Sequence, residues 1–419
     1  MAQLVIEGGR ALAGDVLIDG SKNSALPIIV AAALAEDGIS VLENVPRYTD
    51  ILDLCQILRD LGASVEWLTD RQLAIDAQNL ITHQARYDLA RKLRGSTYLV
   101  GLLLARLGRA DVAFPGGCQI GSRPVNFHIQ GFQALGADMR LEHGSIQGSV
   151  AGRLQGSRIY VERASFGTTL NLMIAGSLAQ GTTVLENAAM EPEIVDVANF
   201  LNAMGARVRG AGTNLVRIEG VERLTGTHHE IIPDRLEAGT YLIAGAITRG
   251  AVTVANVIPE HLNTVLLKLS QAGAKIEADM DWIRIMATKR LSAVDIETLP
   301  HPGFPTDLHP QMVSLLAVCD GVSVVQETVF ENRFGYTHDL SRLGADVKVD
   351  RETAIVRGVN RLTGAPVQAQ DIRGGAALVL AALKAEGTTI VDGVESIDRG
   401  YQALEEKMAA LGAVIRRQP

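Results

Sequence analysis

The chain has 419 residues, of which 47% are hydrophobic and 21% are charged, a composition typical of a folded protein. This length is more than twice the ~150 residues that one hydrophobic core commonly organises, so at least two lobes are expected. The 39 Lys and Arg residues against 47 Asp and Glu residues give a net charge of −8, and aromatic residues make up only 4%. We therefore expect no nucleic-acid partner, and an anionic ligand would require a local basic pocket.

The sequence contains no recognisable membrane or export signal. Its longest apolar stretch, residues 25–35, is far shorter than the ~20 residues that cross a bilayer. The first residues, MAQLVIEGGR, lack the basic start and apolar run of a secretory signal. The three cysteines, Cys55, Cys118 and Cys319, cannot all pair and do not form a disulfide framework. A cytoplasmic location is predicted.

Two short phrases recur along the chain. The first ends in Gly-Ala, and its glycines lie 68 to 74 residues apart, at positions 62, 136, 205, 273, 344 and 412. Each copy ends a stretch of helical periodicity, where a left-handed glycine can close a helix, and precedes an alternating run typical of a strand. The second phrase follows an Ala-rich helical stretch and introduces β-branched residues, at glycines 38, 181, 321 and 387, with a looser copy at 250.

These phrases predict a repeated unit of helix, strand, helix and strand pair, present six times. Two lobes of three units, each burying its Ala-rich helices among its own sheets, form the simplest architecture. The alternative is a regular solenoid, which would have polar capping repeats at its ends, and the sequence has none that we recognise.

Two cations in the first half precede predicted helices. Lys22 and Asn23 follow a strand-like segment and open an Ala-rich helix, and Arg94 heads another helix in the same way. A cation at a helix N-terminus is electrostatically unfavourable, so it indicates an anion to neutralise. The alternative for Lys22 is a solvated side chain in a loop.

Cys118 lies in the glycine-rich segment FPGGCQIGSRP, whose backbone can approach a ligand closely. Arg123, five residues later, can stabilise a thiolate or bind an anion. Cys55 and Cys319 lie among apolar residues and are predicted to be buried and inert. The spacing identifies no base for Cys118, so support for a papain-like nucleophile is weak.

Asp307 lies in HPGFPTDL, where two prolines and a glycine predict a rigid, non-repetitive loop. Its carboxylate is either a general base or a turn residue that satisfies its own backbone. Asp371-Ile372-Arg373 and Asp398-Arg399 each predict an arginine at the start of a helix. With the two cations above, these four helix starts favour a phosphate-rich ligand over surface ion pairs.

Other signatures are missing from the sequence. It has no HExxH motif, and the adjacent His228 and His229 would point apart, so a metal site is unsupported. Phosphate-loop and clean GxGxxG motifs are also missing, so neither nucleoside-triphosphate hydrolysis nor dinucleotide chemistry is indicated. No cofactor is expected.

Several segments together resemble one known family. They are GSKNSALPI, FPGGCQIGSRPVNFHIQGFQALGA, ENAAMEPEIVDVANFL, PDRLEAGTYL, PGFPTDLHPQ, ETVFENRF and IDRGYQALEEKM. Over nearly its whole length the chain resembles the UDP-N-acetylglucosamine enolpyruvyl (1-carboxyvinyl) transferases, and the PGGC and PGFPTD segments are the most specific. The related shikimate-pathway transferase shares the fold but does not carry this cysteine loop.

The resemblance implies an α/β fold of two inside-out barrel lobes, each a pseudo-threefold arrangement of three βαβαββ units. Residues 22–232 would form the first lobe, with the Cys118 loop. Residues 1–21 and 233–419 would form the second lobe, with Asp307, Arg373 and Arg399. The resemblance also implies a substrate cleft between the lobes that closes on ligand, and a monomer.

The implied reaction moves the enolpyruvyl group of phosphoenolpyruvate to the 3′-hydroxyl of UDP-N-acetylglucosamine and releases phosphate. This is the first committed step of peptidoglycan precursor synthesis. The enol ether must be protonated on its methylene carbon, and a base assists the sugar hydroxyl; each such transfer contributes about 10²- to 10⁴-fold. Fixed Arg and Lys side chains must hold the phosphate during the reaction.

The resemblance also implies roles for individual residues. Cys118 matches the proton donor, which in this family forms an adduct with phosphoenolpyruvate and is alkylated by fosfomycin, and Asp307 matches the carboxylate near the attacking hydroxyl. Lys22, Arg123 and Arg399 match phosphoenolpyruvate ligands. Arg373 matches another cation of the cleft, and Arg333 and Asp371 match two polar cleft residues. The residues that match the nucleotide-sugar site are Asn23, Arg94, Arg123, Pro124, Val125, Asn126, Phe127 and Val329.

The chain departs from the family pattern at a few positions. Asn126 stands where Asp is common, Phe127 where a smaller apolar residue is common, and Arg163 begins a variant segment. Gly374 and Gly375 are expected to loosen a loop that often carries Ala. These changes are expected to act on nucleotide affinity or loop mobility, and none removes a group that the chemistry requires.

Two other functions compete with the transferase. A thiol-dependent hydrolase is disfavoured because no base for Cys118 is identified. A non-catalytic paralogue that binds nucleotide sugars is disfavoured because Lys22, Cys118, Arg123, Asp307 and Arg399 are all present.

Overall fold

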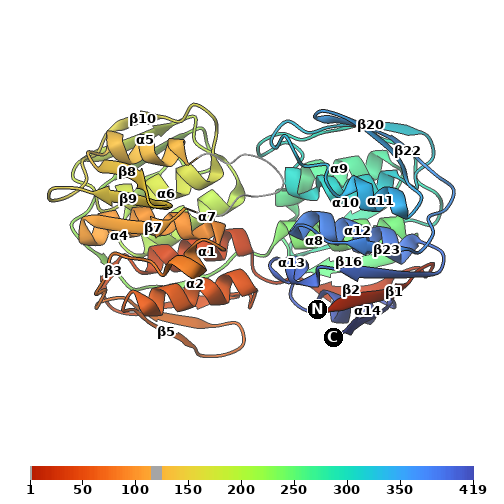
Figure 1. The fold of residues 1–419 in the computed structure, drawn as a ribbon, viewed down its shortest axis with the longest axis horizontal. Coiled ribbons are helices and arrows are strands. Elements are labelled where there is room, and N and C mark those ends of the chain that lie inside the picture. The colour runs from red at the N-terminus through yellow and green to blue at the C-terminus, as the bar shows by residue number, and fades with distance from the viewer. Residues whose placement is uncertain (1, 115–124) are drawn as a thin grey trace. The chain divides into compact units, whose positions relative to one another are not determined.

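The structure of the chain is a computed structural model that describes residues 2–114 and 125–419. These residues form two compact units (Figure 1). The first unit comprises residues 20–114 and 125–232, and the second unit comprises residues 2–19 and 233–419. The chain therefore starts in the second unit, builds the first unit, and returns to complete the second. Each unit has a hydrophobic core of its own.

Buried helices form the middle of each unit. These core helices are α1 (Lys22–Ala32), α4 (Tyr98–Leu107) and α6 (Phe166–Gly176) in the first unit, and α8 (Arg235–Ile247), α10 (His309–Leu316) and α12 (Ile372–Lys384) in the second. Most residues of these helices are buried, and their middle turns are rich in Ala, Leu, Ile and Val, as helices enclosed on all sides require. Small residues let them pack closely: a Cβ on Gly101 of α4 would lie 2.4 Å from Asn171 Oδ1 of α6.

The other helices are shorter or more exposed. In the first unit they are α2 (Thr49–Asp60), α3 (Tyr87–Ala90), the 3₁₀ helix η1 (Arg94–Thr97), α5 (Asn126–Ala134) and α7 (Pro192–Ala203). In the second unit they are η2 (Pro259–Leu262), α9 (Asn263–Gln271), η3 (Thr306–Leu308), α11 (Thr337–Arg342), α13 (Val394–Asp398) and α14 (Leu404–Ala410).

The strands of the first unit are β3 (Ala35–Asp37), β4 (Ser40–Glu43), β5 (Ser64–Trp67), β6 (Leu73–Asp76), β7 (Arg109–Ala113), β8 (Asp138–Glu142), β9 (Ser145–Ser149), β10 (Arg158–Tyr160), β11 (Thr182–Glu186), β12 (Arg207–Arg209), β13 (Leu215–Glu219), β14 (Leu224–Thr225) and β15 (His228–Glu230). They pair in the orders β15-β4-β6-β5, β10-β11-β13-β12 and β7-β9-β8, with a small β14-β3 pair. In the β7 sheet, Gln84 forms a parallel bridge to Asp111 in place of an edge strand.

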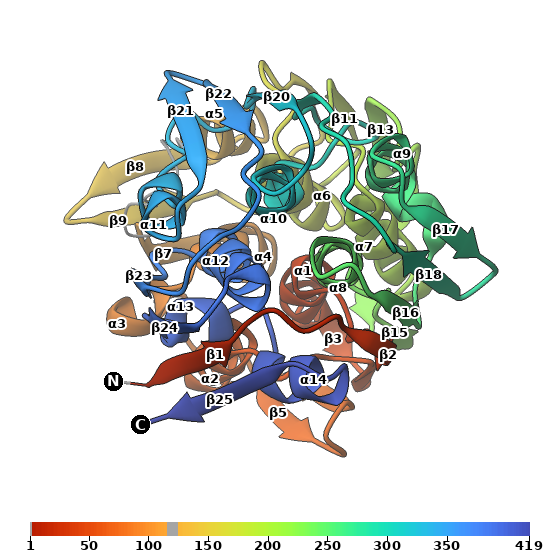
Figure 2. The ribbon, with the colours of Figure 1, turned by 90° about the vertical axis from the view of Figure 1, so that its right-hand side faces the viewer.

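The strands of the second unit are β1 (Gln3–Glu7), β2 (Ala13–Leu17), β16 (Ala251–Ala255), β17 (Lys275–Ala278), β18 (Trp282–Met286), β19 (Ile296–Glu297), β20 (Val322–Gln326), β21 (Asp346–Asp350), β22 (Thr353–Arg357), β23 (Pro366–Gln368), β24 (Thr388–Asp392) and β25 (Val414–Gln418). Their orders are β2-β16-β18-β17, β19-β20-β22-β21 and β23-β24-β1-β25. Figure 2 shows these sheets around α8, α10 and α12, which are seen nearly end-on. The first strand of the chain, β1, lies between β24 and β25.

One pairing pattern recurs in the larger sheets of the described chain. An edge strand, or the Gln84 bridge, runs parallel to its neighbour, and the next two pairings are antiparallel, as in β15-β4-β6-β5. Three sheets with this pattern surround the core helices of each unit. This arrangement confirms the predicted fold class, and the solenoid alternative is wrong because the sheets close around the helices instead of stacking in a row.

The glycines of the first repeated phrase confirm the predicted helix ends. All have a positive φ, between 89° and 109°. They follow α2, α5, α7, α9, α11 and α14 and precede β5, β8, β12, β17, β21 and β25. The glycines of the second phrase also have a positive φ, except at the looser copy, where Arg249 has a φ of 57° and a Cβ on Gly250 would lie 1.9 Å from Leu12 O.

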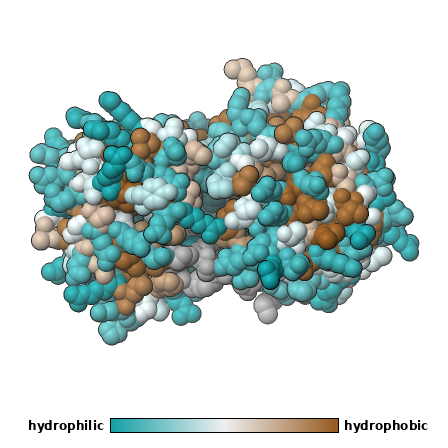
Figure 3. Space-filling model, turned by 90° about the horizontal axis from the view of Figure 1, so that it is seen from above, coloured by the Kyte–Doolittle hydropathy of each residue, from teal (hydrophilic) through white to brown (hydrophobic). Residues whose placement is uncertain are grey.

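One face of the molecule is largely polar (Figure 3). On the face seen in Figure 3, hydrophilic side chains surround scattered hydrophobic ones. Among the described helices, none combines the length and the apolar character needed to span a membrane.

Candidate active site

Predicted site residues of the first unit lie at the N-terminal ends of its core helices. Lys22 and Asn23 begin α1 after the N-cap Ser21, whose Oγ accepts a hydrogen bond from Ser24 N. Arg94 begins η1, which runs directly into α4. Unpaired backbone N–H groups and the helix dipole make such ends favourable for anions.

Lys22 is buried in an ion pair. Its Nζ lies 2.9 Å from Asp50 Oδ2 of α2, and the two side chains are 9% and 8% exposed. The alternative of a solvated lysine is therefore wrong. The sequence contains no motif around Asp50, and sequence reasoning missed it.

A second carboxylate holds the start of α1. Asp196 of α7 accepts a hydrogen bond of 2.6 Å from Ser24 Oγ, and its other oxygen lies 2.8 Å from His229 Nε2 of β15. The neighbouring His228 lies 3.0 Å from Glu43, so the adjacent histidines have different partners. In the described residues, no group of three or more His, Cys, Asp or Glu side chains is arranged to hold a metal ion.

Three of the predicted nucleotide-sugar residues, Val125, Asn126 and Phe127, lie at the start of α5. Val125 is buried before α5, and Asn126 and Phe127 are the first residues of α5. The next residue, His128, is buried with its Nδ1 3.0 Å from Asn171 Nδ2. Burial lowers the pKa of His128 to about 4, with a smaller contribution from the positive charge of Arg94. The charge of Arg94 is therefore felt in the first turn of α5.

Cys118, Arg123 and Pro124 lie outside the described residues. The other two cysteines, Cys55 and Cys319, are buried free thiols. The prediction that these thiols are buried is therefore confirmed, and burial raises the pKa of each to about 12, which disfavours the reactive thiolate.

In the second unit, Asp307 lies in η3, which leads directly into α10. Residues 301–305 form the predicted non-repetitive loop, but Asp307 itself lies in a single 3₁₀ turn before His309 begins α10. Asp307 faces two guanidinium groups: Arg333 Nη2 donates to its Oδ1 at 2.8 Å, and Arg373 Nε lies 3.6 Å from its Oδ2.

The two arginines are more deeply buried than the carboxylate between them. Their side chains are 2% and 5% exposed, against 29% for Asp307. Burial alone would lower the pKa of Arg373, but Tyr401, Asp307 and Asp234 raise it above its ordinary value, so the guanidinium stays charged. Arg333 Nε and Arg373 Nη1 are buried with no hydrogen-bond partner among the described residues.

Asp371 is the N-cap of α12. Its Oδ1 accepts hydrogen bonds from Arg373 N at 2.9 Å and Gly374 N at 3.0 Å. A Cβ on Gly374 would lie 2.6 Å from Asp371 Oδ2, and one on Gly375 would lie 2.7 Å from Ile397 Cγ1. The expectation that these glycines loosen a loop is therefore wrong, because both pack tightly in the first turn of a buried helix.

Arg399 does not open a helix. It is the C-cap of α13, and the next helix, α14, begins only at Leu404. The predicted helix start is wrong at this position, and a cation at a helix C-terminus is favoured by the dipole. Lys22, Arg94 and Arg373 remain as cations at helix starts.

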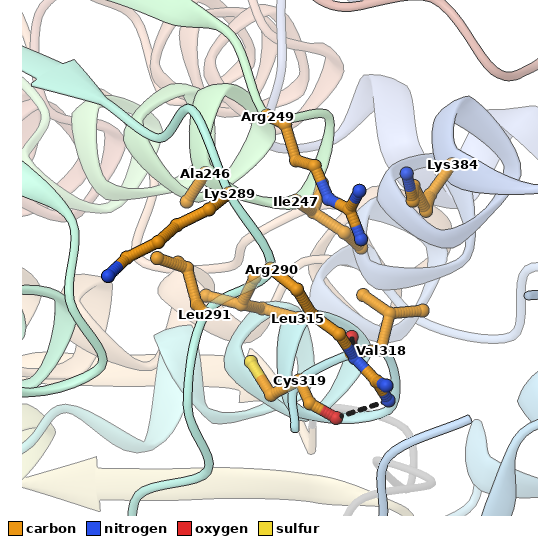
Figure 4. Close-up of a pocket in the computed structure, with 10 residues that line it drawn as sticks. All are labelled: Ala246, Ile247, Arg249, Lys289, Arg290, Leu291, Leu315, Val318, Cys319 and Lys384. Carbon is orange, nitrogen blue, oxygen red and sulfur yellow. Dashed lines mark hydrogen bonds between the residues drawn. The ribbon is translucent and has the colours of Figure 1, made fainter. Parts of the chain in front are cut away.

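The C-terminal ends of α8, α10 and α12 form a small basic pocket, lined by Ala246, Ile247, Arg249, Lys289, Arg290, Leu291, Leu315, Val318, Cys319 and Lys384 (Figure 4). Arg290 donates to the carbonyl oxygens of Val318 at 3.0 Å and Cys319 at 2.8 Å, while the Lys289 ammonium points away (Figure 4). Arg153 makes the same kind of bonds to Leu178 in the first unit. Because helix C-termini attract cations, these charges have a structural explanation.

Comparisons with known proteins agree with this architecture. A family profile described as EPSP synthase (3-phosphoshikimate 1-carboxyvinyltransferase) matches residues 6–408. The chain is similar to the solved enolpyruvyl transferase NikO from Streptomyces tendae, with 27% identity, a TM-score of 0.89, and 100% of this chain and 99% of that chain covered. An EPSP synthase from Acinetobacter baumannii, at 20% identity and a TM-score of 0.80 with both chains covered completely, shares the fold.

Two curated relatives are more similar in sequence. UDP-N-acetylglucosamine 1-carboxyvinyltransferase 2 of Symbiobacterium thermophilum is 62% identical, covering 100% of this chain and 98% of the relative. UDP-N-acetylglucosamine 1-carboxyvinyltransferase of Halothermothrix orenii is 48% identical, with both chains covered completely. The chain therefore belongs to the family of the UDP-N-acetylglucosamine 1-carboxyvinyltransferases, within the wider EPSP synthase family.

Proposed function

We propose that this protein transfers the enolpyruvyl group of phosphoenolpyruvate to the 3′-hydroxyl of UDP-N-acetylglucosamine and releases phosphate. The observation that carries the proposal is 62% identity, over the whole chain, to a relative named for this activity. The cations and carboxylates at the core-helix starts support it, because the reaction needs both an anion site and an acceptor for a hydroxyl proton.

Phosphoenolpyruvate would bind through its phosphate to Lys22, Arg123 and Arg399, with Arg373 as a further cation. The N-terminal ends of α1 and α12 would add their dipoles to this attraction. UDP-N-acetylglucosamine would bind Asn23, Arg94, Arg123, Pro124, Val125, Asn126, Phe127 and Val329, with Arg333 and Asp371 as polar neighbours.

The chemistry would proceed by addition and elimination. Cys118 donates its proton to the methylene carbon, while the 3′-oxygen bonds to the neighbouring carbon and its proton passes to Asp307. The resulting tetrahedral intermediate then returns a methyl proton to the Cys118 thiolate and expels phosphate, which takes up the proton held by Asp307, and the enol ether remains on the sugar. Because Arg333 and Arg373 face Asp307, the carboxylate is held as an anion that orients the hydroxyl.

The two units are proposed to act as lobes, with residues 22–232 in the first and residues 1–21 and 233–419 in the second. The lobes would close around the substrates and exclude water from the reacting groups. The protein would work in the cytoplasm as a monomer, in the first committed step of peptidoglycan synthesis, and so serve cell-wall growth and division.

Phosphate release measures the proposed reaction directly. The purified protein should release phosphate from phosphoenolpyruvate only when UDP-N-acetylglucosamine is present, with stoichiometric formation of the enolpyruvyl sugar nucleotide. Release without the sugar nucleotide would support a hydrolase instead. Binding of UDP-N-acetylglucosamine without any release would support the non-catalytic paralogue.

Fosfomycin tests the assignment of Cys118. Peptide mapping after incubation should find one alkylated thiol at Cys118 and none in a Cys118→Ser variant. Cys55 and Cys319 serve as internal controls, because burial raises their pKa values to about 12. Labelling at either of them would overturn the assignment.

A further inference from the structure

Glu327 is a buried carboxylate that directly follows β20, in a segment that also carries Val329 and Arg333. Its side chain is 0% exposed. One oxygen, Oε1, accepts hydrogen bonds from the backbone N–H groups of Val329 at 2.8 Å and Phe330 at 3.1 Å. The same oxygen accepts from Thr298 Oγ1 at 2.9 Å. This half of the carboxylate therefore fixes the start of the Val329–Arg333 segment.

The other oxygen, Oε2, holds the turn that contains Asp307. Thr306 Oγ1 and His309 Nδ1 each lie 2.9 Å from it. These residues flank Asp307 on its two sides in the chain. One carboxylate thus joins η3 to the segment that supplies Arg333, the partner of Asp307.

The protonation of this cluster follows from its partners. An ionised carboxylate only accepts, so His309 Nδ1 carries the proton and its Nε2 accepts from Tyr336 Oη at 3.2 Å. Burial lowers the pKa of His309, although Glu327 opposes the shift, so the ring stays neutral. Burial alone would raise the pKa of Glu327, but the His309 bond and the backbone N–H groups hold it below its ordinary value.

We propose that Glu327 is a positioning residue, which sets the Asp307 carboxylate against its arginine partner and toward the attacking hydroxyl. The inference rests on the proposed function and deepens it. Glu327 has no contact with substrate in this scheme and acts only through Asp307. Displacement of a reacting group by about 1 Å can cost on the order of 10²-fold in rate, so a fixed turn has a direct catalytic value.

The Glu327→Gln variant tests the role. It preserves side-chain volume but places an amide N–H where an acceptor is needed, opposite either Thr306 and His309 or the backbone donors. We expect kcat to fall about 10- to 100-fold, with KM for both substrates within about threefold, because Asp307 acts in the chemical step. Unchanged kcat in a folded Glu327→Gln protein would overturn the proposal.

A double variant separates positioning from general damage. If Glu327 acts through Asp307, Glu327→Gln in an Asp307→Asn background should change kcat by less than about twofold. If the kcat losses of the two substitutions multiply in the double variant, Glu327 supports the fold in general and does not act through Asp307. If Asp307→Asn alone is as active as the wild type, the role of Asp307 in the proposed function fails first; if wild-type phosphate release is missing, the reaction itself fails.

Two further variants keep the test decisive. Asp339→Asn removes the charge of another buried carboxylate of the second unit, which accepts from Gln368 N at 3.0 Å, and should leave kcat unchanged. Thr306→Val removes one bond to Glu327 without adding a buried polar group, and should lower kcat about three- to tenfold even if Glu327→Gln does not fold. Equal effects of Asp339→Asn and Thr306→Val on kcat would contradict the proposal.

Discussion

Buried charges define the candidate site at the scale of single residues. Asp307 faces two arginines, Lys22 pairs with Asp50, and Glu327 collects five hydrogen bonds. Removing one member of a buried ion pair typically costs 3–5 kcal/mol, because the remaining charge has no compensation. Side chains that are proposed to bind substrate, such as Lys22 and Asp307, are thus also tied to the fold.

Asp307→Asn should separate catalysis from folding. The amide keeps the shape of the side chain but loses the charge that accepts a proton, so kcat should fall by about 10²- to 10⁴-fold. Steady-state phosphate release measures the loss, and circular dichroism checks that the variant is folded. Asp320→Asn, at an exposed carboxylate 3.7 Å from Arg290, is the matched control and should retain full activity. Near-normal turnover in Asp307→Asn would refute the assigned role.

His128 should make stability depend on pH. Its pKa is lowered from 6.5 to about 4 in the folded chain, chiefly by burial, so the unfolded chain binds the extra proton between these values. The contribution of His128 to the free energy of unfolding should therefore be fully present above pH 6.5. As the pH drops toward 4, the free energy of unfolding should fall by about 3 kcal/mol.

Urea unfolding at a series of pH values measures this effect. A His128→Gln variant, which cannot titrate, should show a correspondingly flatter acid limb than the wild type. Parallel curves for the two proteins would show that His128 does not contribute.

The sequence predicted Lys22 and Asp307 as important residues but not their partners. Lys22 stands out because a cation at a helix start is unfavourable, and Asp307 because of the prolines around it. Asp50 and Glu327 carry no such local signal; their importance arises from tertiary contacts across 28 residues and across 18 to 29 residues, respectively. The roles of Cys118 and Arg123 stay predictions.

At the scale of elements, local glycine chemistry made the helix ends predictable. Each recurring Gly-Ala phrase marks a left-handed glycine between a helix and a strand. The segment IDRGYQALEEKM was harder, because its periodicity does not separate α13 from α14. The break between them includes Ala403 with a φ of 47°. Alanine rarely adopts a positive φ, so the sequence does not predict this conformation.

Two of the repeat glycines form a matched pair for measurement. Both have a positive φ, but a Cβ on Gly205 would meet nothing within 4 Å, whereas one on Gly62 would lie 2.4 Å from Asn79 O. Gly205→Ala should cost about 1–2 kcal/mol from backbone strain alone. Gly62→Ala should cost clearly more, and chemical denaturation of the two variants compares them. Equal losses would contradict the steric difference.

At the scale of the whole chain, the spacing of the repeats predicted six units and two lobes. Spacing alone does not tell which sheet receives the first strand, since strand pairing between distant segments leaves no periodic mark. The structure places β1 between β24 and β25, with Leu4 opposite both Val391 and Arg417. The two ends of the sequence are therefore joined by hydrogen bonds within one sheet.

Deleting residues 2–8 should unfold part of the protein selectively. The deletion removes an inner strand from the β23-β24-β1-β25 sheet, so the second unit should lose its cooperative transition in calorimetry while the first unit keeps its own. Adding a synthetic peptide of residues 2–8, which contains β1, should restore the missing transition. An unaltered calorimetric profile in the truncated protein would contradict this dependence.

The place of β1 also sets an order of events during synthesis. Residues 20–232 emerge from the ribosome as one continuous stretch and can fold while translation continues, since domains generally fold as they are made. Strand β1 emerges before this stretch, yet its partners β24 (Thr388–Asp392) and β25 (Val414–Gln418) emerge only after it. β1 must therefore remain without its strand partners while residues 20–387 are made.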